Sequence, residues 1–294
     1  MHVDVGVMVY NEEKNIIKLL ESLANQKLEN VVIDKIVVVS SGSTDRTNAL
    51  VLEYGERKDN RVELITQGKR VGKPSAINEF LKNSTTDIVI ISSGDVIFDD
   101  RTIEQLSFPF HDKTIGMTSV FPVPVNKKDG FMGFVANMHW KMHNTLNRHG
   151  ESIAFRKKLV GYLPSSVVAD EAYVEAVIQK KKMKAVHVKG AVVFNKGPET
   201  VYEFLKQIKR HFLGHLQLEF EFHYSVSSMT KSGINSTLRE LLALSIAEPS
   251  KIPYCFGYLS LEFLGRILGT LSLVFGKKNP VLWEIARSTK SLKN

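Results

Sequence analysis

Residues 3–16, VDVGVMVYNEEKNI, decide the fold of this chain. A nearly continuous run of Val, Gly and Met ends in the polar segment at residues 10–13, and an apolar pattern with helical spacing follows it. Such a run is typical of a strand that is buried on both faces. We therefore expect a strand over residues 3–9 and a helix over residues 12–26.

The same alternation continues toward residue 91. Strands are predicted over residues 35–39, 62–65 and 87–91, and helices over residues 46–54 and 73–81. This order indicates an α/β protein with a Rossmann-like, mostly parallel central sheet flanked by helices. In such sheets ligands bind beyond the carboxyl ends of the strands. Polar residues follow three strands, at residues 10–12, 40–45 and 92–95, which predicts a ligand site there.

The second half is less regular. Residues 121–150 combine prolines with Met, His and Trp, so long loops or short helices over the sheet are expected. Residues 200–224 predict a long amphipathic helix that is capped by Thr200 with Glu203 three positions on, and residues 237–247 predict another helix.

Composition narrows the function classes. The chain has 294 residues, a net charge of +8 and a single cysteine, Cys255, which excludes an internal disulfide. The N-terminus lacks the basic-then-apolar order of a signal peptide, so a cytoplasmic protein is expected. The basic residues are scattered rather than striped, which favours phosphorylated substrates or an anionic membrane surface over nucleic acid.

A C-terminal apolar stretch, residues 252–276, is nearly long enough to span a bilayer. Glu262 and Arg266 lie in its middle, and each charge costs about 2.5–3.5 kcal/mol at a bilayer centre. Together with Gly269 and Thr270 they form a polar stripe at helical spacing. The stripe predicts a helix that lies in the interface of the cytoplasmic face of the membrane, as a peripheral or monotopic contact. A soluble core helix or a dimer helix is the alternative.

Four motifs occur in one order: VGVMVYNEEKNI at residues 5–16, VVVSSGSTDRT at 37–47, GKRVGKPSAINEFL at 68–81 and IVIISSGDV at 88–96. Together they resemble the donor half of family 2 glycosyltransferases with the GT-A fold. The resemblance implies an inverting enzyme that moves a sugar from a nucleotide-diphosphate sugar to a hydroxyl or phosphate acceptor with a divalent metal, Mn²⁺ or Mg²⁺. It also implies a GT-A domain over residues 1–230, with a nucleotide-sugar half at 1–100 and an acceptor half at 101–230, before C-terminal helices at 231–294.

The resemblance assigns roles to the donor half. Nucleotide-sugar contacts are implied for seven residues: Tyr10, Asn11, Glu12, Ser41, Arg70, Lys73 and Ser93. Two positions depart from the family pattern, because Ser41 and Ser93 stand where the family usually has aspartate. The last acid of the Asp-x-Asp motif remains as Asp95, which is implied to be the metal ligand; a carboxylate with diphosphate oxygens suits a hard cation.

The acceptor half continues the resemblance through residues 150–159, 167–178 and 191–215. Asp170 matches the family's catalytic base, with Ala169 in place of the usual glutamate, although an aspartate there also suits a helix N-cap. Gln207 and Arg210 match the Gln-x-x-Arg-Trp motif, in which Gln207 is implied to contact the nucleotide sugar and Arg210 to neutralise the leaving diphosphate. His211 replaces the tryptophan, which favours a single-addition enzyme. His215, one turn further, is a second candidate metal ligand.

Two other readings stay open. The serines at 41 and 93 and the alanine at 169 are compatible with a catalytically impaired nucleotide-sugar or glycan-binding protein. A sugar-nucleotide pyrophosphorylase on a similar sheet would need a Gly-rich loop after the first strand, where Tyr10 to Glu12 stand instead. A looser similarity to membrane-associated members reaches Trp283, Arg287, Ser288 and Lys290, and the acceptor is expected to be a glycan or a lipid-linked molecule.

Overall fold

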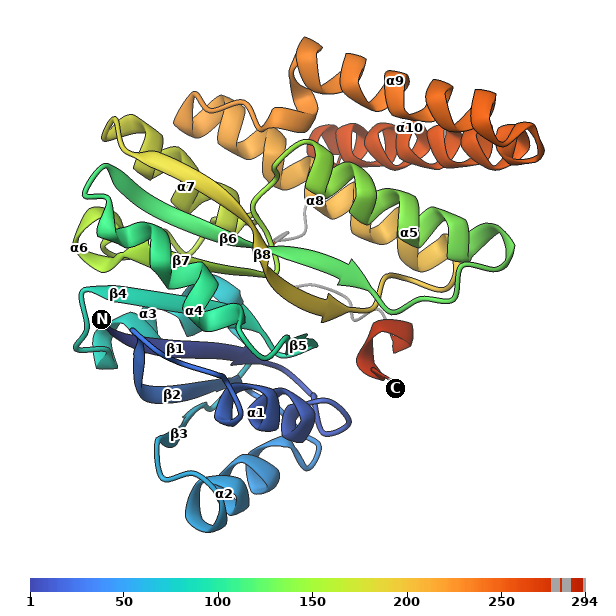
Figure 1. The fold of residues 1–294 in the computed structure, drawn as a ribbon. Coiled ribbons are helices and arrows are strands. Elements are labelled where there is room, and N and C mark those ends of the chain that lie inside the picture. The colour runs from blue at the N-terminus through green and yellow to red at the C-terminus, as the bar shows by residue number, and fades with distance from the viewer. Residues whose placement is uncertain (276–280, 282–286, 293–294) are drawn as a thin grey trace.

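The computed structural model describes residues 1–275, 281 and 287–292. An eight-stranded sheet in the order β3-β2-β1-β4-β7-β6-β8-β5 forms its centre (Figure 1). The strands are β1 (His2–Val9), β2 (Val32–Ser41), β3 (Val62–Gln67), β4 (Ile88–Ser93), β5 (Val96–Phe98), β6 (Ile115–Pro124), β7 (Ser152–Arg156) and β8 (Lys184–Asn195). The strands and helices expected before residue 91 are all present.

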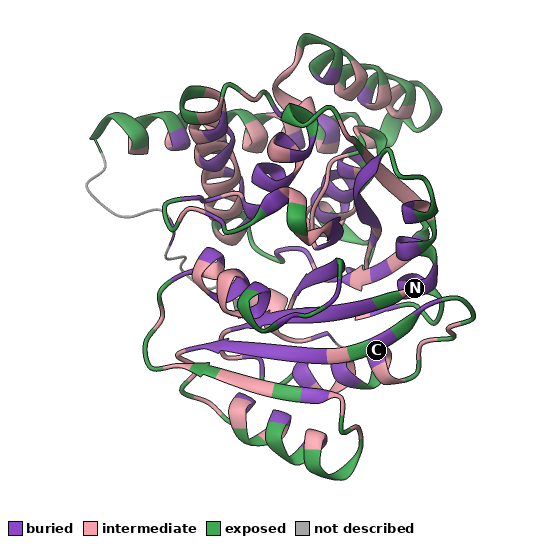
Figure 2. Cartoon of the chain, turned by 90° about the vertical axis from the view of Figure 1, so that its left-hand side faces the viewer, coloured by how far each residue is buried: buried purple, intermediate pink, exposed green. Residues whose placement is uncertain are grey.

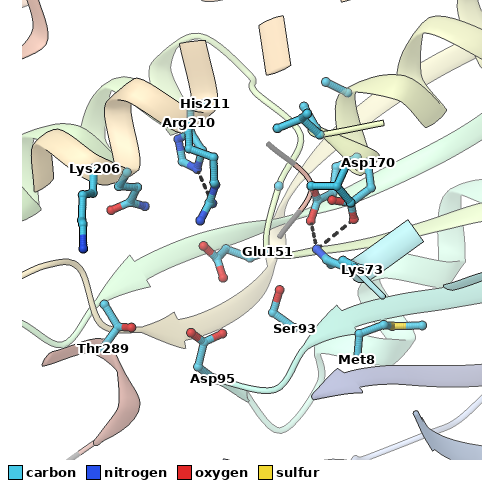
Figure 3. A pocket seen from close by; sticks show the side chains of 18 of the residues that line it. Met8, Lys73, Ser93, Asp95, Glu151, Asp170, Lys206, Arg210, His211 and Thr289 are labelled. Carbon is cyan, nitrogen blue, oxygen red and sulfur yellow. Dashed lines mark hydrogen bonds and ion pairs between the residues drawn. The ribbon is translucent and has the colours of Figure 1, made fainter. Parts of the chain in front are cut away.

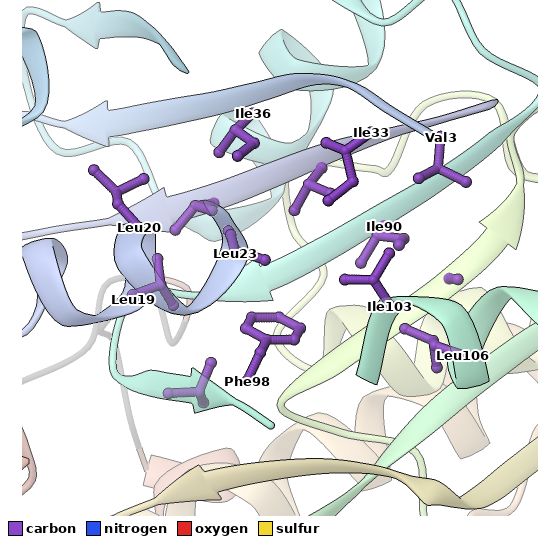
Figure 4. Close-up of a cluster of buried hydrophobic side chains, with 14 of the residues drawn as sticks. Val3, Leu19, Leu20, Leu23, Ile33, Ile36, Ile90, Phe98, Ile103 and Leu106 are labelled. Atoms are coloured by element: carbon purple, nitrogen blue, oxygen red, sulfur yellow. The ribbon is translucent and has the colours of Figure 1, made fainter. Parts of the chain in front are cut away.

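Helices cover both faces of the sheet. They are α1 (Ile16–Ala24), α2 (Thr47–Arg57), α3 (Lys73–Asn83), α4 (Thr102–Ser107), α5 (Gly130–Thr145), α6 (Lys157–Val160), α7 (Asp170–Lys180), α8 (Val201–Phe222), α9 (Lys231–Ala247) and α10 (Ile252–Phe275). One core cluster joins α1, α2 and α4 to one face of the sheet (Figure 4), and a second joins α3, α6 and α7 to the other. Because both faces are covered, β1 is buried from Val3 to Val9, as its apolar run predicts.

The sheet is mixed, with a parallel part and an antiparallel part. Strands β1, β2, β3 and β4 pair in parallel, whereas β7 pairs antiparallel with both β4 and β6. The strand order reverses between β1 and β4, which creates the crevice where α/β proteins bind ligands. Because β7 runs antiparallel to β4, the start of β7 lies at the same edge as the end of β4.

The expectation of loops or short helices over residues 121–150 is wrong. Strand β6 continues to Pro124, and α5 then runs for 16 residues. Its residues Phe134, Val135, Met138 and Met142 pack in a third core cluster with α8, α9 and α10. Both sides of α5 are covered, so its sequence carries no simple amphipathic pattern, and its aromatic and histidine residues hide the helical period.

The two long C-terminal helices were expected and are present, with different boundaries. Helix α8 begins after Thr200, whose side chain accepts a hydrogen bond from the Glu203 backbone N–H at 3.2 Å, as the capping pattern predicts. Helix α9 begins at Lys231, six residues before the expected start at residue 237. Helix α10 packs along α8, where Gly265 and Gly269 allow close contact with Ile208 and Phe212.

The charged residues of the polar stripe on α10, Glu262 and Arg266, contact other protein side chains, whereas Thr270 is exposed. The Glu262 carboxylate lies 3.4 Å from His139 Nδ1 of α5 and 3.2 Å from the Tyr258 hydroxyl of α10. Arg266 lies 3.7 Å from the same carboxylate. The partners of Glu262 lie on α5 and within α10, so the sequence alone does not reveal them. The outward face of α10 is largely apolar, and in Figure 2 the C-terminal helices carry long exposed stretches.

By length and composition, residues 249–275 could cross a membrane: their mean hydropathy reaches 1.4, and 17% of the most apolar window is buried. Trp283, part of the similarity expected near the C-terminus, lies outside the described residues.

Candidate active site

A cavity of about 950 Å³ opens at the carboxyl ends of β1, β2 and β4. Eleven of the twelve residues that the sequence singles out line this cavity, and Asn11 does not. Asn11 instead braces the loop after β2: its side-chain oxygen accepts the Thr44 backbone N–H at 2.8 Å. We call the side formed by Tyr10, Glu12, Ser41, Arg70 and Asp95 the donor wall. The acceptor wall is formed by Asp170, Gln207, Arg210, His211 and His215.

Tyr10 and Arg70 form a flat platform on the donor wall. The Arg70 guanidinium lies over the Tyr10 ring, 4.2 Å from its centroid. The loops that carry this platform pack tightly, because Gly42 has a φ of 71° and a side chain there would meet the Arg70 backbone nitrogen at 2.7 Å. Ser41 connects the same loops by accepting a hydrogen bond from the Val71 backbone N–H at 3.4 Å. The arrangement suits a planar ring such as a nucleobase.

Asp95 reaches the cavity from a tight turn between β4 and β5. A side chain at Gly94 would meet Val9 at 2.7 Å and Glu12 at 2.8 Å, so only glycine lets this turn pack against the end of β1. Burial raises the pKa of Asp95, although the charges of Lys73 and Arg210 oppose the shift. A buried carboxyl of this kind is a favourable ligand for a hard cation.

Lys73 joins the two walls. Its ammonium lies 2.8 Å from Asp170 Oδ2 and 2.5 Å from Glu171 Oε1 (Figure 3), so it reaches α7 from the donor half. Burial and the charge of Glu171 raise the pKa of Asp170 to about 7, against the opposing effect of Lys73. Asp170 is the first residue of α7 and Ala169 is its N-cap, so the N-cap role considered for Asp170 is wrong. Its carboxyl is instead held in the cavity as a weak base.

Arg210 projects from α8 into the middle of the acidic groups. One of its guanidinium nitrogens lies 2.9 Å from His211 Nε2, and burial lowers the pKa of Arg210 to about 10 despite the nearby acids. Gln207 lies one turn before it on the same wall, with its side-chain oxygen buried. Arg210 therefore presents a positive charge to any anion in the cavity.

His215 lines the same cavity but has cations as neighbours. Burial and the charges of Arg148 and Arg266 lower its pKa well below the ordinary value. A positively charged neighbourhood disfavours a metal cation, which weighs against His215 as a ligand.

Among the described residues, no three His, Cys, Asp or Glu side chains converge into a complete metal site. The oxygen ligands of Asp95 and its acidic neighbours do fit a divalent cation that is completed by a diphosphate and water.

Glu151, which the sequence did not single out, lies directly before β7 and points into the cavity (Figure 3). Burial and the charge of Asp95 raise the pKa of Glu151 to about 8. An acid between Gly150 and a short apolar run was the available signal. It was missed because only the antiparallel pairing of β7 with β4 brings this residue to the donor wall.

Residues 288–292 pack back against the cavity, a contact that the sequence does not indicate. Lys290 forms an ion pair with Glu12, and the Leu292 backbone N–H donates to Asn15 Oδ1 at 2.9 Å. Ser288 hydrogen-bonds the Glu203 carboxylate on α8. Residues 288–292 thus connect the two walls, and Thr289 and Lys290 line the cavity. No local pattern near the C-terminus predicts this return.

Comparison with known proteins agrees with the fold and the cavity. The model of the family described as glycosyl transferase family 2 matches residues 4–163. Because this match covers more than half of the chain, the protein belongs to glycosyl transferase family 2.

Individual relatives are more distant. A dolichyl-phosphate beta-glucosyltransferase, ALG5D, from Trichomonas vaginalis is 35% identical over 100 residues, which cover 32% of this chain and 30% of that protein. The match thus spans less than a third of that relative's length.

Two solved structures share the architecture. A mannosyltransferase from Pyrobaculum calidifontis, in complex with GDP-Man and Mn²⁺, aligns with a TM-score of 0.65 and 21% identity over 94% of this chain and 88% of that one. S. aureus TarS 1-349 with UDP-GlcNAc aligns with a TM-score of 0.54 and 16% identity over 93% and 92%. At these identities the similarities establish the fold alone.

Proposed function

We propose that the protein is an inverting glycosyltransferase that moves a sugar from a nucleotide-diphosphate sugar to an acceptor hydroxyl or phosphate. The observation that carries the proposal is one cavity that holds a platform for a base, an acidic pair at Asp95 and Glu151, and a buried carboxyl at Asp170. Family membership adds support. These groups are the ones that binding a nucleotide sugar and deprotonating an acceptor require.

On the donor side, Tyr10 and Arg70 would stack on the nucleobase, and Ser41 would hydrogen-bond its edge. Arg210 would face the diphosphate, because its guanidinium lies on α8 among the acids that a bound metal would neutralise. Asp95 is the proposed ligand of a divalent cation, which supplies charge neutralisation for the leaving diphosphate when it is bound. The relatives in solved complexes carry GDP and UDP sugars, so the nucleobase is left open here.

On the acceptor side, Asp170 would take the proton of the acceptor hydroxyl. The acceptor oxygen then forms a bond to the anomeric carbon as the bond from that carbon to the diphosphate breaks, and the nucleoside diphosphate leaves. Burial keeps the Asp170 carboxyl more basic than usual, with a pKa of about 7, which suits a general base near neutral pH. Lys73 would orient the carboxyl through its 2.8 Å ion pair.

A thermal-shift screen of the purified protein against UDP, GDP, dTDP and CMP, each with and without Mn²⁺, tests this function. A ligand that binds only the folded state raises the melting temperature. We expect one nucleotide to raise it in a Mn²⁺-dependent manner. No shift with any nucleotide would favour the glycan-binding alternative, which the serines at 41 and 93 motivated; turnover that disappears in Asp170→Asn would exclude that alternative.

We also propose that α9 and α10 dock on the cytoplasmic face of the membrane. Their outward faces expose large apolar residues: Ile234, Leu238, Leu242 and Ile246 on α9, and Phe256, Phe263, Ile267 and Phe275 on α10. An apolar face of this extent on two adjacent helices favours a lipid surface, and the net charge of +8 favours an anionic one. The charged groups of α10 contact other protein side chains, so they do not oppose docking.

Phe256→Glu with Phe263→Glu tests the docking surface. Both side chains are about 70% exposed, so the fold should be retained, while co-sedimentation with vesicles of anionic phospholipid should be lost. The matched control is Phe108→Glu. Phe108 is 62% exposed and lies after α4, outside the two docking helices. Equal sedimentation of both variants would contradict membrane docking by these helices.

A lipid-linked acceptor fits this arrangement. The cavity wall includes Leu213 on α8 and Leu273 and Phe275 on α10, so an apolar side of the cavity lies next to the proposed docking surface. The relative named as a dolichyl-phosphate beta-glucosyltransferase is consistent with a lipid phosphate. Transfer to a polyprenyl phosphate, compared with transfer to a soluble sugar, would decide between a lipid-linked acceptor and a free glycan.

A further inference from the structure

Ser93 stands where the usual Asp-x-Asp motif has its first acid. The pairing of β4 with β7 places another acid, Glu151, next to it. Strands β4 and β7 pair antiparallel, with Ser92 opposite Ser152 and their hydroxyl oxygens 2.7 Å apart. The next step of this ladder is a hydrogen bond from the Ser93 backbone N–H to the Glu151 carbonyl oxygen, at 3.2 Å. Glu151 is thus the cross-strand neighbour of the serine that replaces the acid.

The backbone at Glu151 is in an unfavourable conformation. Its φ is 60°, in the left-handed region that side-chain-bearing residues rarely adopt. Such a conformation costs on the order of 1 kcal/mol and tends to persist where a side chain must be aimed at a site. A glycine would relieve the cost, and Gly150 lies next to it in the chain, yet the strained position carries an acid.

The Glu151 carboxyl lies close to that of Asp95. Figure 3 shows both side chains directed into the same part of the cavity, with Ser93 beside them and Arg210 above. The negative charge of Asp95 acts directly on Glu151. The positive charges of Lys73 and Arg210 act on Asp95, and that of Lys73 also acts on Glu151, but among residues 1–275, 281 and 287–292 neither carboxyl group is held in a direct ion pair. Two neighbouring carboxyl groups ionise together only at an electrostatic cost, which a cation bound between them removes.

We propose that Glu151 supplies the carboxylate that position 93 lacks, so that Asp95 and Glu151 together bind the divalent cation of the nucleotide-sugar site. The inference rests on the proposed function and deepens it by assigning a ligand. Two carboxylates from different loops would give a hard cation more oxygen ligands than Asp95 alone, and a diphosphate and water would complete the shell.

The test is a titration of the full chain with Mn²⁺, in the presence of the nucleotide that the thermal-shift screen selects. Bound Mn²⁺ is measured from the loss of the free-ion signal in electron paramagnetic resonance, which needs no turnover. Glu151→Gln keeps the shape and removes the charge, and it should weaken Mn²⁺ binding about 10-fold or more, because even supporting residues of metal sites contribute 10- to 100-fold. Glu175→Gln, a buried acid of α7 outside the cavity wall, should leave it unchanged.

A rescue variant makes the assignment specific. Ser93→Asp combined with Glu151→Gly returns the acid to the motif and places glycine at the left-handed position, so Mn²⁺ affinity should recover most of the loss. It also tests the idea if Glu151→Gln fails to fold. Unchanged Mn²⁺ affinity in Glu151→Gln, or a loss that the double variant does not recover, overturns the inference.

The remaining outcomes separate this inference from the function on which it rests. Weaker binding of the nucleotide sugar to Glu151→Gln without Mn²⁺, with normal Mn²⁺ affinity, would make Glu151 a sugar contact and overturn the ligand role. If the wild-type protein binds nucleotide but no Mn²⁺, the ligand role fails while nucleotide binding stands. If it binds neither, the proposed function fails as well.

Discussion

The donor wall and the acceptor wall of the cavity are built in different ways. Donor-wall residues follow directly after parallel strands, so each one is positioned by its immediate neighbours in the chain. Acceptor-wall residues lie on α7 and α8; α7 packs on the sheet and against α8, and α8 is supported by α5 and α10 from distant parts of the sequence. The donor wall is therefore a property of the sheet, whereas the acceptor wall depends on helix packing.

The two walls also differ in chemistry. The donor wall carries acids, serines and one stacked arginine, but no histidine. Five histidines line the acceptor side of the cavity, at positions 139, 143, 149, 211 and 215, and burial lowers the pKa of His143, His149, His211 and His215. Neutral imidazoles add hydrogen-bonding groups without adding charge. Because its histidines are neutral, the acceptor side is a polar surface of low charge around Arg148 and Arg210.

The largest expected effect separates the chemical roles of the walls. Asp170→Asn removes the proposed base on the acceptor wall and should lower kcat by about 10² to 10⁴-fold, the usual contribution of general base catalysis. The Mn²⁺-dependent thermal shift by nucleotide, which reports the donor wall, should be retained. In the wild type, kcat should fall as the pH drops through about 7, where Asp170 becomes protonated.

Steady-state kinetics with the donor found in the thermal-shift screen checks this prediction. Asp99→Asn, an exposed acid after β5, serves as the control and should keep wild-type kcat. A loss of less than about tenfold in Asp170→Asn would remove Asp170 from the role of base.

A smaller effect tests the dependence of the acceptor wall on α10. A side chain at Gly265 would meet Ile208 Cγ2 of α8 at 2.6 Å, so Gly265→Leu should force the helices apart and destabilise the fold by about 1–3 kcal/mol. The melting temperature in detergent should drop, while the nucleotide-induced shift persists because the donor wall lies in the sheet. Thr270→Leu, on the exposed side of α10, should have little effect. If Gly265→Leu also abolished the nucleotide-induced shift, the donor wall would depend on the contact between α8 and α10, which would contradict the distinction between the two walls.

The smallest effect concerns the neutral histidines. Burial and the charges of Arg148 and His187 lower the pKa of His143 well below 6.5, so its contribution to stability is present above pH 6.5 and is lost as the pH falls below that value. Each unit of pH in this window costs at most about 1.4 kcal/mol for one group. His143→Gln should therefore lose less stability than the wild type between pH 6.5 and 5.

Urea unfolding at several pH values measures this difference. His111→Gln changes an exposed histidine and is the control, with the pH dependence of the wild type expected. If the free energy of unfolding changed equally with pH in His143→Gln and in the wild type, His143 would not become charged on unfolding.

The sequence predicted the donor wall well because its signals are local. The motifs around Tyr10, Ser41 and Asp95 each end a buried strand, and parallel strands bring their carboxyl ends together without further information. Asn11 is the exception, since its left-handed backbone, with a φ of 53°, turns its side chain to the neighbouring loop. The acceptor half was predicted less completely: α5 was missed, and the protein contacts of Glu262 and Arg266 on α10 were not foreseen.

The α/β order, the strand ends at which the site lies and the residue types that chemistry there requires all follow from the sequence alone. Strand periodicity and capping act within a few residues, so a linear pattern records them. Only the tertiary structure decided that Glu151 stands beside Ser93, that Lys73 reaches Asp170, and that Lys290 returns to Glu12. Those contacts join segments separated by tens to hundreds of residues, and only the antiparallel pairing of β7 and the packing of the helices bring them together.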